Sequence, residues 1–290
     1  MWKYADGLID SDMSSEMLLG KILAKENAVL TPNWFYSTEL RVLNTQLVFF
    51  FFFHFFHDWT VVRVASSAIL YLIFLASYYY LLRQMGYGRR LFAISAILLM
   101  LPLSWVYFAY VLLGLYCIPH ISISFVTLGL LFQYARTNEK SSKVIVVFLM
   151  TILSVLAGMG GIRQIIILYL PIVLATLFLT FFYNKDKLCF LLNGIMCFAF
   201  SIIGYLINIR VFTHKYHFSK FTDIQWKKFS VSGLESILNG FFTIFGFSEG
   251  KIFSITTLTN GFAFMMIITT GCIYITLNFE RASREGIFEN

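Results

Sequence analysis

Long apolar segments separated by short charged connectors dominate the pattern of hydrophobic and polar positions in this chain. About 20 apolar residues are enough for a helix to cross the hydrocarbon core of a bilayer. Seven segments approach that length: 61–82, 91–110, 113–135, 144–160, 164–183, 188–209 and 259–279. The pattern predicts an all-α, polytopic membrane protein with about seven transmembrane helices, six of them within residues 61–209.

Three further parts surround the six-helix region. Residues 1–60 form a largely polar loop with short helices, residues 210–258 form a second loop, and residues 259–290 hold the last span and a tail. The second loop mixes basic with aromatic residues and has helical periodicity from Val231 onward. Such segments favour the headgroup layer, which predicts an amphipathic surface segment. A lid over a lipid-linked substrate is an alternative for the same residues.

The apolar stretch Leu43–Phe56 precedes the first span. Its 14 residues are too few to cross about 30 Å of hydrocarbon at 1.5 Å per residue, so we expect a helix that lies in the membrane interface. Five consecutive phenylalanines, Phe49 to Phe53, would surround this helix and contact both lipid and protein. The alternative is that the stretch joins the next span as one long tilted helix.

Basic residues are concentrated in alternate connectors, which is the signal that sets membrane orientation. Eight lie in the connectors 83–90, 136–143 and 184–187. The connectors between them carry only Arg163. The first set is predicted to be cytoplasmic, which places residues 1–60 and 210–258 outside. Residues 1–46 are mostly polar and contain neither a cleavable signal nor a span, so we expect a missing first transmembrane helix. Unaided translocation of the N-terminus is the alternative.

Composition agrees with this class of protein. The chain is 59% hydrophobic and 13% charged, with a mean hydropathy of +0.76, which lies far outside soluble globular usage. The net charge of +7 comes from connector residues, so it reports topology and excludes nucleic-acid binding. The cysteines form no CxxC pair and lie in apolar segments, where packing is their expected role.

Acidic residues gather near the N-terminus, which is the first place to look for acid or base chemistry. Asp12 precedes a predicted helix, Met13–Lys25, and Glu16 lies four residues further on, so both carboxylates would share one helix face. The alternative is structural: Asp12 as an N-cap and Glu16 as a solvated residue of the first turn.

The order of features after Asp12 is distinctive. A helix is followed by Pro32-Asn-Trp34, Glu39-Leu-Arg41, Phe49 to Phe56, His57-Asp58 and Arg63-Val-Ala-Ser66. This order resembles the first extracytoplasmic loop of the GT-C superfamily of membrane glycosyltransferases, which includes protein O-mannosyltransferases and bacterial aminoarabinose transferases of lipid A. Met13 stands where the family has a second acid, and His57-Asp58 stands in place of Phe-Gly. Gly161-Ile-Arg163-Gln164 also resembles an outer-face Gly-Arg turn of these enzymes.

The resemblance implies transfer of a sugar from a polyprenyl-phosphate donor to an extracytoplasmic acceptor, at the bacterial plasma membrane. Asp12 would be the general base, with Glu39 as a second catalytic acid. The residues expected to bind substrate are Asp10, Glu16, Arg41, Arg63 and Arg163, with the arginines neutralising charge on the departing phosphate. No metal and no other cofactor is expected, and membrane lipids are the further partners.

Each assignment has an alternative. Arg163 can simply extend toward lipid phosphates, Arg41 can pair with Glu39 or Asp58, and the histidines near the aromatic helix can be interfacial anchors. For the whole chain, the alternatives are a polysaccharide polymerase or ligase, a lipid-linked oligosaccharide transporter, and a non-catalytic membrane scaffold. The spans hold few ionisable residues, which argues against an ion-coupled transporter.

Overall fold

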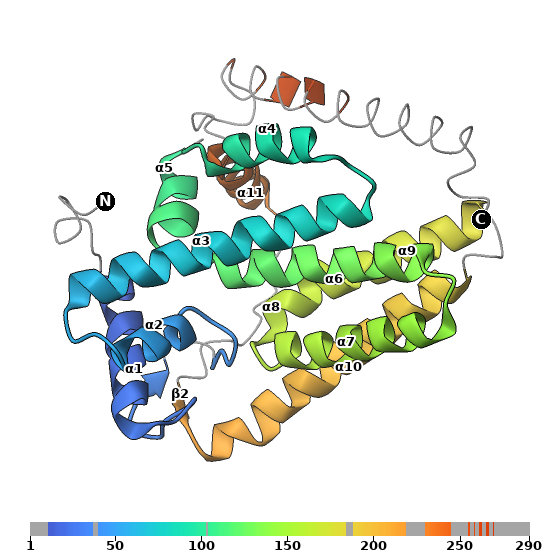
Figure 1. Cartoon of the computed structure of the whole chain (residues 1–290). Coiled ribbons are helices and arrows are strands. Elements are labelled where there is room, and N and C mark those ends of the chain that lie inside the picture. The colour runs from blue at the N-terminus through green and yellow to red at the C-terminus, as the bar shows by residue number, and fades with distance from the viewer. Residues whose placement is uncertain are drawn as a thin grey trace. The chain divides into compact units, whose positions relative to one another are not determined.

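The computed structural model describes residues 11–36, 40–102, 104–183, 188–218 and 230–244, and single positions between Ile255 and Thr269. The chain divides into two compact units, one formed by residues 1–101 and 110–224 and the other by 102–109 and 225–290. Figure 1 shows the described elements in chain order by colour. In the second unit, helix α11 (Val231–Ile244) confirms the helix predicted from Val231, and both Val231 and Ile237 are exposed.

Four helices in the described residues are long and apolar enough to cross a membrane. They are α3 (Trp59–Gln84), α6 (Ile118–Arg136), α7 (Lys140–Gly158) and α10 (Leu188–Arg210). A fifth span is counted if Arg89–Met100 and Trp105–Leu113 form one broken span. The helical membrane architecture was therefore predicted correctly, and the prediction of seven spans was wrong for the described part of the chain.

The predicted span 91–110 is interrupted near its middle. Helix α4 (Arg89–Met100) ends where Leu101 adopts an extended conformation ahead of Pro102. A proline disfavours helical geometry in the residue before it and supplies no N–H of its own, so the helix cannot continue. The chain resumes as α5 (Trp105–Tyr107) and the π-helix η2 (Phe108–Leu113).

Two other predicted spans also differ. The segment 164–183 is built from α8 (Ile162–Gln164), the π-helical η3 (Ile165–Tyr169) and α9 (Leu170–Tyr183). Only 162–178 forms a continuous apolar helix in the described residues, which is short for a span. The predicted span 259–279 lies almost entirely outside the described residues.

Helix α10 buries its small and polar residues and exposes its large apolar ones. The buried face holds Asn193, Gly194, Cys197, Ser201, Gly204 and Asn208, and from Gly194 onward the spacings alternate between three and four. Leu192, Ile203 and Leu206 lie on the exposed face. A soluble helix shows the opposite arrangement, whereas a helix surrounded by lipid uses small residues for close packing.

The contact between α7 and α10 depends on two glycines. A Cβ atom at Gly158 would lie 1.9 Å from the Ser201 carbonyl oxygen, and one at Gly204 would lie 2.1 Å from the Val155 carbonyl oxygen. No larger side chain fits at either position without a shift of the backbone. We call this contact the α7–α10 seam.

Helices α3 and α6 run parallel and side by side (Figure 1). Near their N-termini, Arg63 donates a hydrogen bond to the carbonyl of Leu113. Near their C-termini, Tyr80 Oη donates to Gln133 Oε1 at 2.6 Å. The basic connector residues Arg83 and Arg136 therefore lie at the end of these helices opposite to Arg63.

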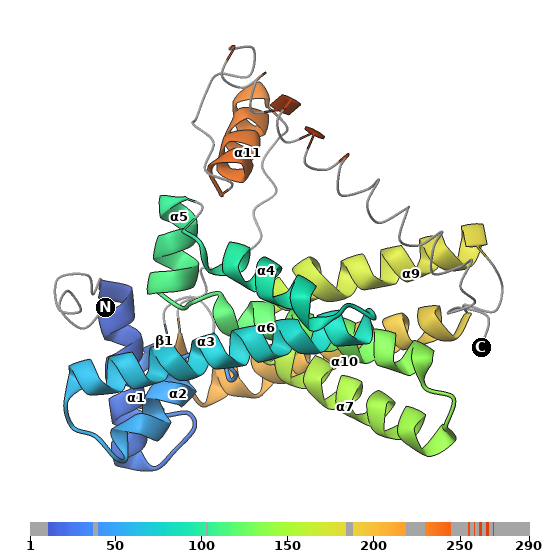
Figure 2. The same ribbon diagram turned by 45° about the horizontal axis from the view of Figure 1, so that its top comes forward.

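Two short helices, α1 (Ser11–Glu26) and α2 (Gln46–Phe53), pack on each other, and α2 packs on α3 (Figure 2). Helix α2 ends before α3 begins, and Asp58 caps α3 by accepting a hydrogen bond from the Val61 N–H. The separate short helix in 43–56 was therefore predicted correctly, and the alternative of one long helix is wrong. Phe49 is buried and Phe51 is exposed, as expected for phenylalanines on all sides.

The segment between α1 and α2 is tied to the chain after α10. Strand β1 (Phe35–Tyr36) pairs in parallel with β2 (His217–Phe218), which follows the 3₁₀-helix η5 (Phe212–His214). Asn208 Nδ2 of α10 donates to the carbonyls of Leu40 at 2.7 Å and Met159 at 2.6 Å. These contacts hold the first loop against the ends of α7 and α10.

Candidate functional site

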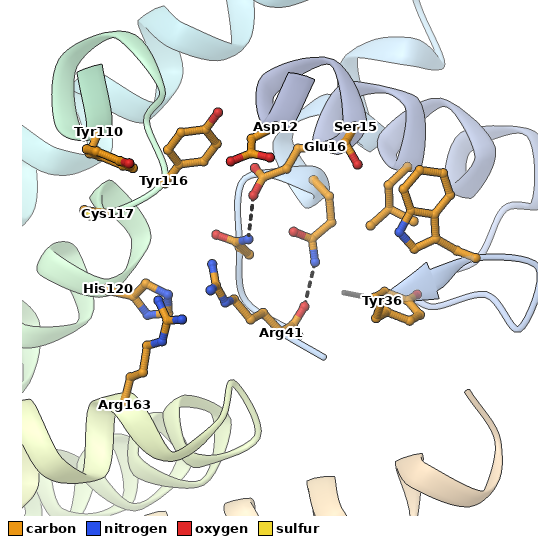
Figure 3. A pocket seen from close by; sticks show the side chains of 14 residues that line it. Asp12, Ser15, Glu16, Tyr36, Arg41, Tyr110, Tyr116, Cys117, His120 and Arg163 are labelled. Atoms are coloured by element: carbon orange, nitrogen blue, oxygen red, sulfur yellow. Dashed lines mark hydrogen bonds between the residues drawn. The ribbon is translucent and has the colours of Figure 1, made fainter. Parts of the chain in front are cut away.

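A cavity of about 350 Å³ lies in the first unit, between α1, the segment after β1, and the N-terminal ends of α6 and α8. Small-molecule sites in proteins begin at about this size. Its described lining consists of Asp12, Ser15, Glu16, Leu19, Trp34, Tyr36, Arg41, Asn44, Gln46, Tyr110, Tyr116, Cys117, His120 and Arg163 (Figure 3). We call it the pocket.

Helix α1 presents two carboxylates to the pocket. Met13 and Met17 are buried on one side of the helix, whereas Asp12 and Glu16 both line the pocket one turn apart. The predicted shared face of these two acids is therefore present. Asp12 is exposed, so its carboxylate is open to a molecule that enters from solvent.

Glu16 is the more deeply placed of the two acids. Its Oε1 accepts a hydrogen bond from Asn44 Nδ2 at 3.3 Å, and its Oε2 is buried with no hydrogen-bond partner among the described residues. Burial raises the pKa of Glu16 to about 7, although the nearby Arg41, the Asn44 hydrogen bond and Arg63 each lower it. Glu16 can therefore take up and release a proton near neutral pH.

Hydrogen bonds to the main chain at residues 40 and 41 fix the position of Arg41. Gln46 Nε2 donates to the Arg41 carbonyl at 2.6 Å, and the preceding Leu40 is buried and bonded to Asn208. The side chain extends into the pocket, where its guanidinium lies near His120 and Arg163 (Figure 3).

Arg163 reaches the pocket from the start of α8. The preceding Gly161 has a φ of 107°, a left-handed conformation that side chains disfavour and glycine adopts readily. Gln164 Nε2 donates to the His120 carbonyl at 3.0 Å, which joins this turn to the start of α6. The predicted Gly-Arg turn is thus present, and it delivers Arg163 to the same cavity as Arg41.

His120 also lines the pocket, although no sequence pattern predicted it as a site residue. Both of its ring nitrogens are buried, and neither has a hydrogen-bond partner in the part of the chain that the structure describes. The residue belongs to the first turn of α6, because this helix begins at Ile118 and not at 113 as predicted. A correct helix start would have placed His120 in the first turn of α6.

Arg63 does not line the pocket. It is only 6% exposed, and its Nη2 donates to the Leu113 carbonyl and to Met13 Sδ, the latter at 3.3 Å. Its guanidinium carbon lies 5.8 Å from the centre of the Phe49 ring. From α3, Arg63 therefore contacts Met13 of α1, Phe49 of α2 and Leu113 of η2.

The other predicted residues are less informative. Asp10 and Glu39 lie outside the described residues. Within the described chain, no group of three or more His, Cys, Asp or Glu side chains is arranged to hold a metal ion. The pocket thus offers two carboxylates, two guanidinium groups and an imidazole, a set suited to proton transfer and to binding an anion.

Comparison of the chain with protein-family models, with curated proteins and with solved structures gives no match.

Proposed function

We propose that the chain is a membrane glycosyltransferase that transfers a sugar from a polyprenyl-phosphate carrier to an acceptor hydroxyl or amine. The observation that carries the proposal is the meeting of Asp12 and Glu16 with Arg41 and Arg163 in one cavity at the ends of apolar helices. Proton acceptors and cations are the two kinds of group that this transfer requires.

The basic connectors support an extracytoplasmic position of the pocket. Arg83 and Arg136 lie at the end of α3 and α6 opposite to the pocket, and Lys140 and Lys143 begin α7 next to Arg136. Basic connectors face the cytoplasm in plasma-membrane proteins. The pocket then faces the extracytoplasmic side, where the resemblance to the GT-C superfamily also places its loop.

The chemical step is a substitution at the anomeric carbon of the sugar. The acceptor oxygen or nitrogen forms a bond to that carbon while the carbon–oxygen bond to phosphate breaks, and the electron pair stays on the phosphate oxygen. Asp12 takes the acceptor proton as general base, and Glu16 contacts the acceptor. Arg41 and Arg163 stabilise the charge that develops on the lipid phosphate.

A transfer assay on membranes that carry the full chain tests this proposal, with polyprenyl-phosphate sugars as donors. Asp12→Asn is expected to lower the transfer rate at least about a hundredfold, because a positioned base contributes that much or more. Arg163→Ala is expected to lower it by a similar factor. Glu26→Gln is the matched control, because Glu26 lies at the exposed end of the same helix and outside the pocket lining.

Two results would contradict the proposal at different levels. Transfer at the normal rate by Asp12→Asn would remove the base assignment and keep the activity. No transfer by the unmodified chain, with equal expression and any of the donors, would remove the transferase and favour a scaffold or a transporter.

A further inference from the structure

His120 is a buried polar group that the proposed chemistry has not used. Its carbonyl accepts from Gln164, so its backbone is fixed, while both ring nitrogens stay buried without a partner in the described chain. A buried imidazole without hydrogen bonds costs free energy of folding, and most such groups in proteins find a partner. The missing partner is therefore expected to be a ligand.

The surroundings of the ring define the charge of that ligand. Figure 3 shows the His120 ring beside the guanidinium groups of Arg41 and Arg163. An imidazole carries at least one N–H donor whatever its charge, and guanidinium groups only donate. Three donors directed at one space match a group that has only acceptors and carries negative charge.

The carboxylate of Glu16 is not that group. Its Oε1 is bonded to Asn44, and its Oε2 has no hydrogen bond to the His120 ring or to any other described residue. Among the described residues no carboxylate is hydrogen-bonded to the His120 ring, so the acceptor that we infer for it lies outside the described chain.

We propose that His120, Arg41 and Arg163 together bind a phosphate monoester, and that His120 donates to the oxygen that the sugar leaves. The inference deepens the proposed function and rests on it for the lipid carrier. A phosphodiester donor has two terminal oxygens, whereas the monoester released after transfer has three. When the bond between the anomeric carbon and the phosphate oxygen breaks, the electron pair stays on that oxygen, which becomes the third acceptor.

This arrangement makes His120 a group that acts on the leaving phosphate. A hydrogen bond that forms only as the oxygen becomes free stabilises the transition state more than the bound donor. The site should then bind the monoester more tightly than the diester, and part of that preference should depend on the imidazole N–H.

The test measures binding to the full chain in nanodiscs of zwitterionic lipid, with farnesyl phosphate, its methyl diester and inorganic phosphate as probes. His120→Phe keeps an aromatic ring and removes the donor. It is expected to weaken farnesyl phosphate binding about tenfold or more, the effect of one hydrogen bond to a charged group, and to weaken diester binding by less than about threefold. His120→Asn, which keeps an N–H donor, is expected to retain part of the affinity.

His54→Phe is the matched control. His54 is exposed, does not belong to the described pocket lining, and its Nδ1 is hydrogen-bonded to the Phe50 carbonyl, so the His54→Phe protein should bind all probes normally. In ¹⁵N spectra of histidine-labelled protein, farnesyl phosphate should shift one ring signal that is missing from His120→Phe. Competition by inorganic phosphate would show that the phosphate group is sufficient for binding. Binding of farnesyl phosphate without any competition by inorganic phosphate would show that the lipid tail is also needed.

The inference is overturned if His120→Phe binds farnesyl phosphate as the unmodified chain does, or if its loss is equal for monoester and diester. Sugar transfer is measured separately on the same preparations. Transfer without any effect of His120 on binding removes this inference alone, whereas His120-dependent phosphate binding without sugar transfer removes the transferase and keeps the phosphate site.

Discussion

The α7–α10 seam and the pocket treat buried polar groups in opposite ways. In the seam, Ser201 Oγ lies beside Gly158 and donates to the Phe198 carbonyl at 2.7 Å, so this polar group is bonded within its own helix. In the pocket, Glu16 Oε2 and the His120 ring nitrogens are buried without partners among the described residues.

The difference separates groups that serve packing from groups that serve a ligand. A polar group that is hydrogen-bonded to its own helix changes the free energy of folding little in either direction. Small residues at such positions let two helices approach closely. A buried group without a partner lowers stability, and proteins keep such groups mainly where binding or catalysis uses them. Substitutions in the two regions should therefore differ in kind as well as in size.

The largest effect is expected in the seam, from Gly158→Ala. The new Cβ would lie 1.9 Å from the Ser201 carbonyl oxygen, so the two helices must separate. Overpacking of this kind against backbone is expected to cost about 3 kcal/mol of stability. The apparent melting temperature in detergent, read by gel filtration after heating, measures it.

The control for this prediction is Gly240→Ala in α11, where an added Cβ would meet nothing within 4 Å. It should leave the melting temperature unchanged or raise it slightly, because alanine favours a helix over glycine. A Gly158→Ala protein as stable as the parent would show that the seam is looser than its geometry implies.

A pH-dependent effect of up to a similar size is expected next, in the pocket, from Glu16→Gln. The pKa of Glu16 is raised from 4.5 to about 7 by burial, so between these pH values the folded protein holds a proton that the unfolded chain has released. Stability from this group is therefore full below pH 4.5 and is lost as the pH rises through 7. Glu16→Gln should match the parent at low pH and exceed its stability by up to about 3 kcal/mol at pH 8.

Melting temperatures of both proteins at pH 5 and pH 8 measure this difference. Glu26→Gln serves as the control. Hydrogen bonds from Thr31 and Asn33 lower the pKa of this exposed carboxyl from 4.5, so its contribution to stability changes only below pH 5. An equal stability difference between the Glu16→Gln protein and the parent at pH 5 and pH 8 would mean that Glu16 is not a buried acid in solution.

The smallest effect is expected from Ser201→Ala in the seam. Among the described residues the hydroxyl bonds to the Phe198 carbonyl of its own helix, and alanine is small enough to keep the contact with Gly158. The expected change is below about 0.5 kcal/mol, measured by the same heating assay. A loss of more than about 2 kcal/mol would indicate a bond from this hydroxyl across the seam and would weaken the contrast with the pocket.

Local sequence signals predicted much of this fold. The separate helix α2 was predicted from the length of 43–56, which is too short for a span, and helix α1 was predicted to follow Asp12. The structure adds Asp58 as the N-cap of α3. Hydropathy did not show the interruption at Pro102, because a single residue changes a 20-residue average little. The same averaging extended the third predicted span back to residue 113, which concealed the first turn of α6.

The pocket was predictable only in part. Asp12, Arg41 and Arg163 could be selected because charges are rare in this chain and their predicted positions lay on one side of the membrane. His120 has no partner nearby in the sequence, and a lone histidine in an apolar segment is more often a packing residue. The raised pKa of Glu16 depends on burial by residues distant in the chain, so no local pattern could reveal it.

The hydrogen bond between Asn208 and Leu40 bears on how the protein is made. The Leu40 carbonyl accepts from Asn208, which is synthesised 168 residues later. At ribosomal speeds of about 5–20 residues per second, the first loop spends on the order of ten seconds or more without this anchor. The pocket is therefore completed late in biogenesis. In a nascent chain stalled before α10, the segment that carries Arg41 would lack the hydrogen bond from Asn208 to Leu40.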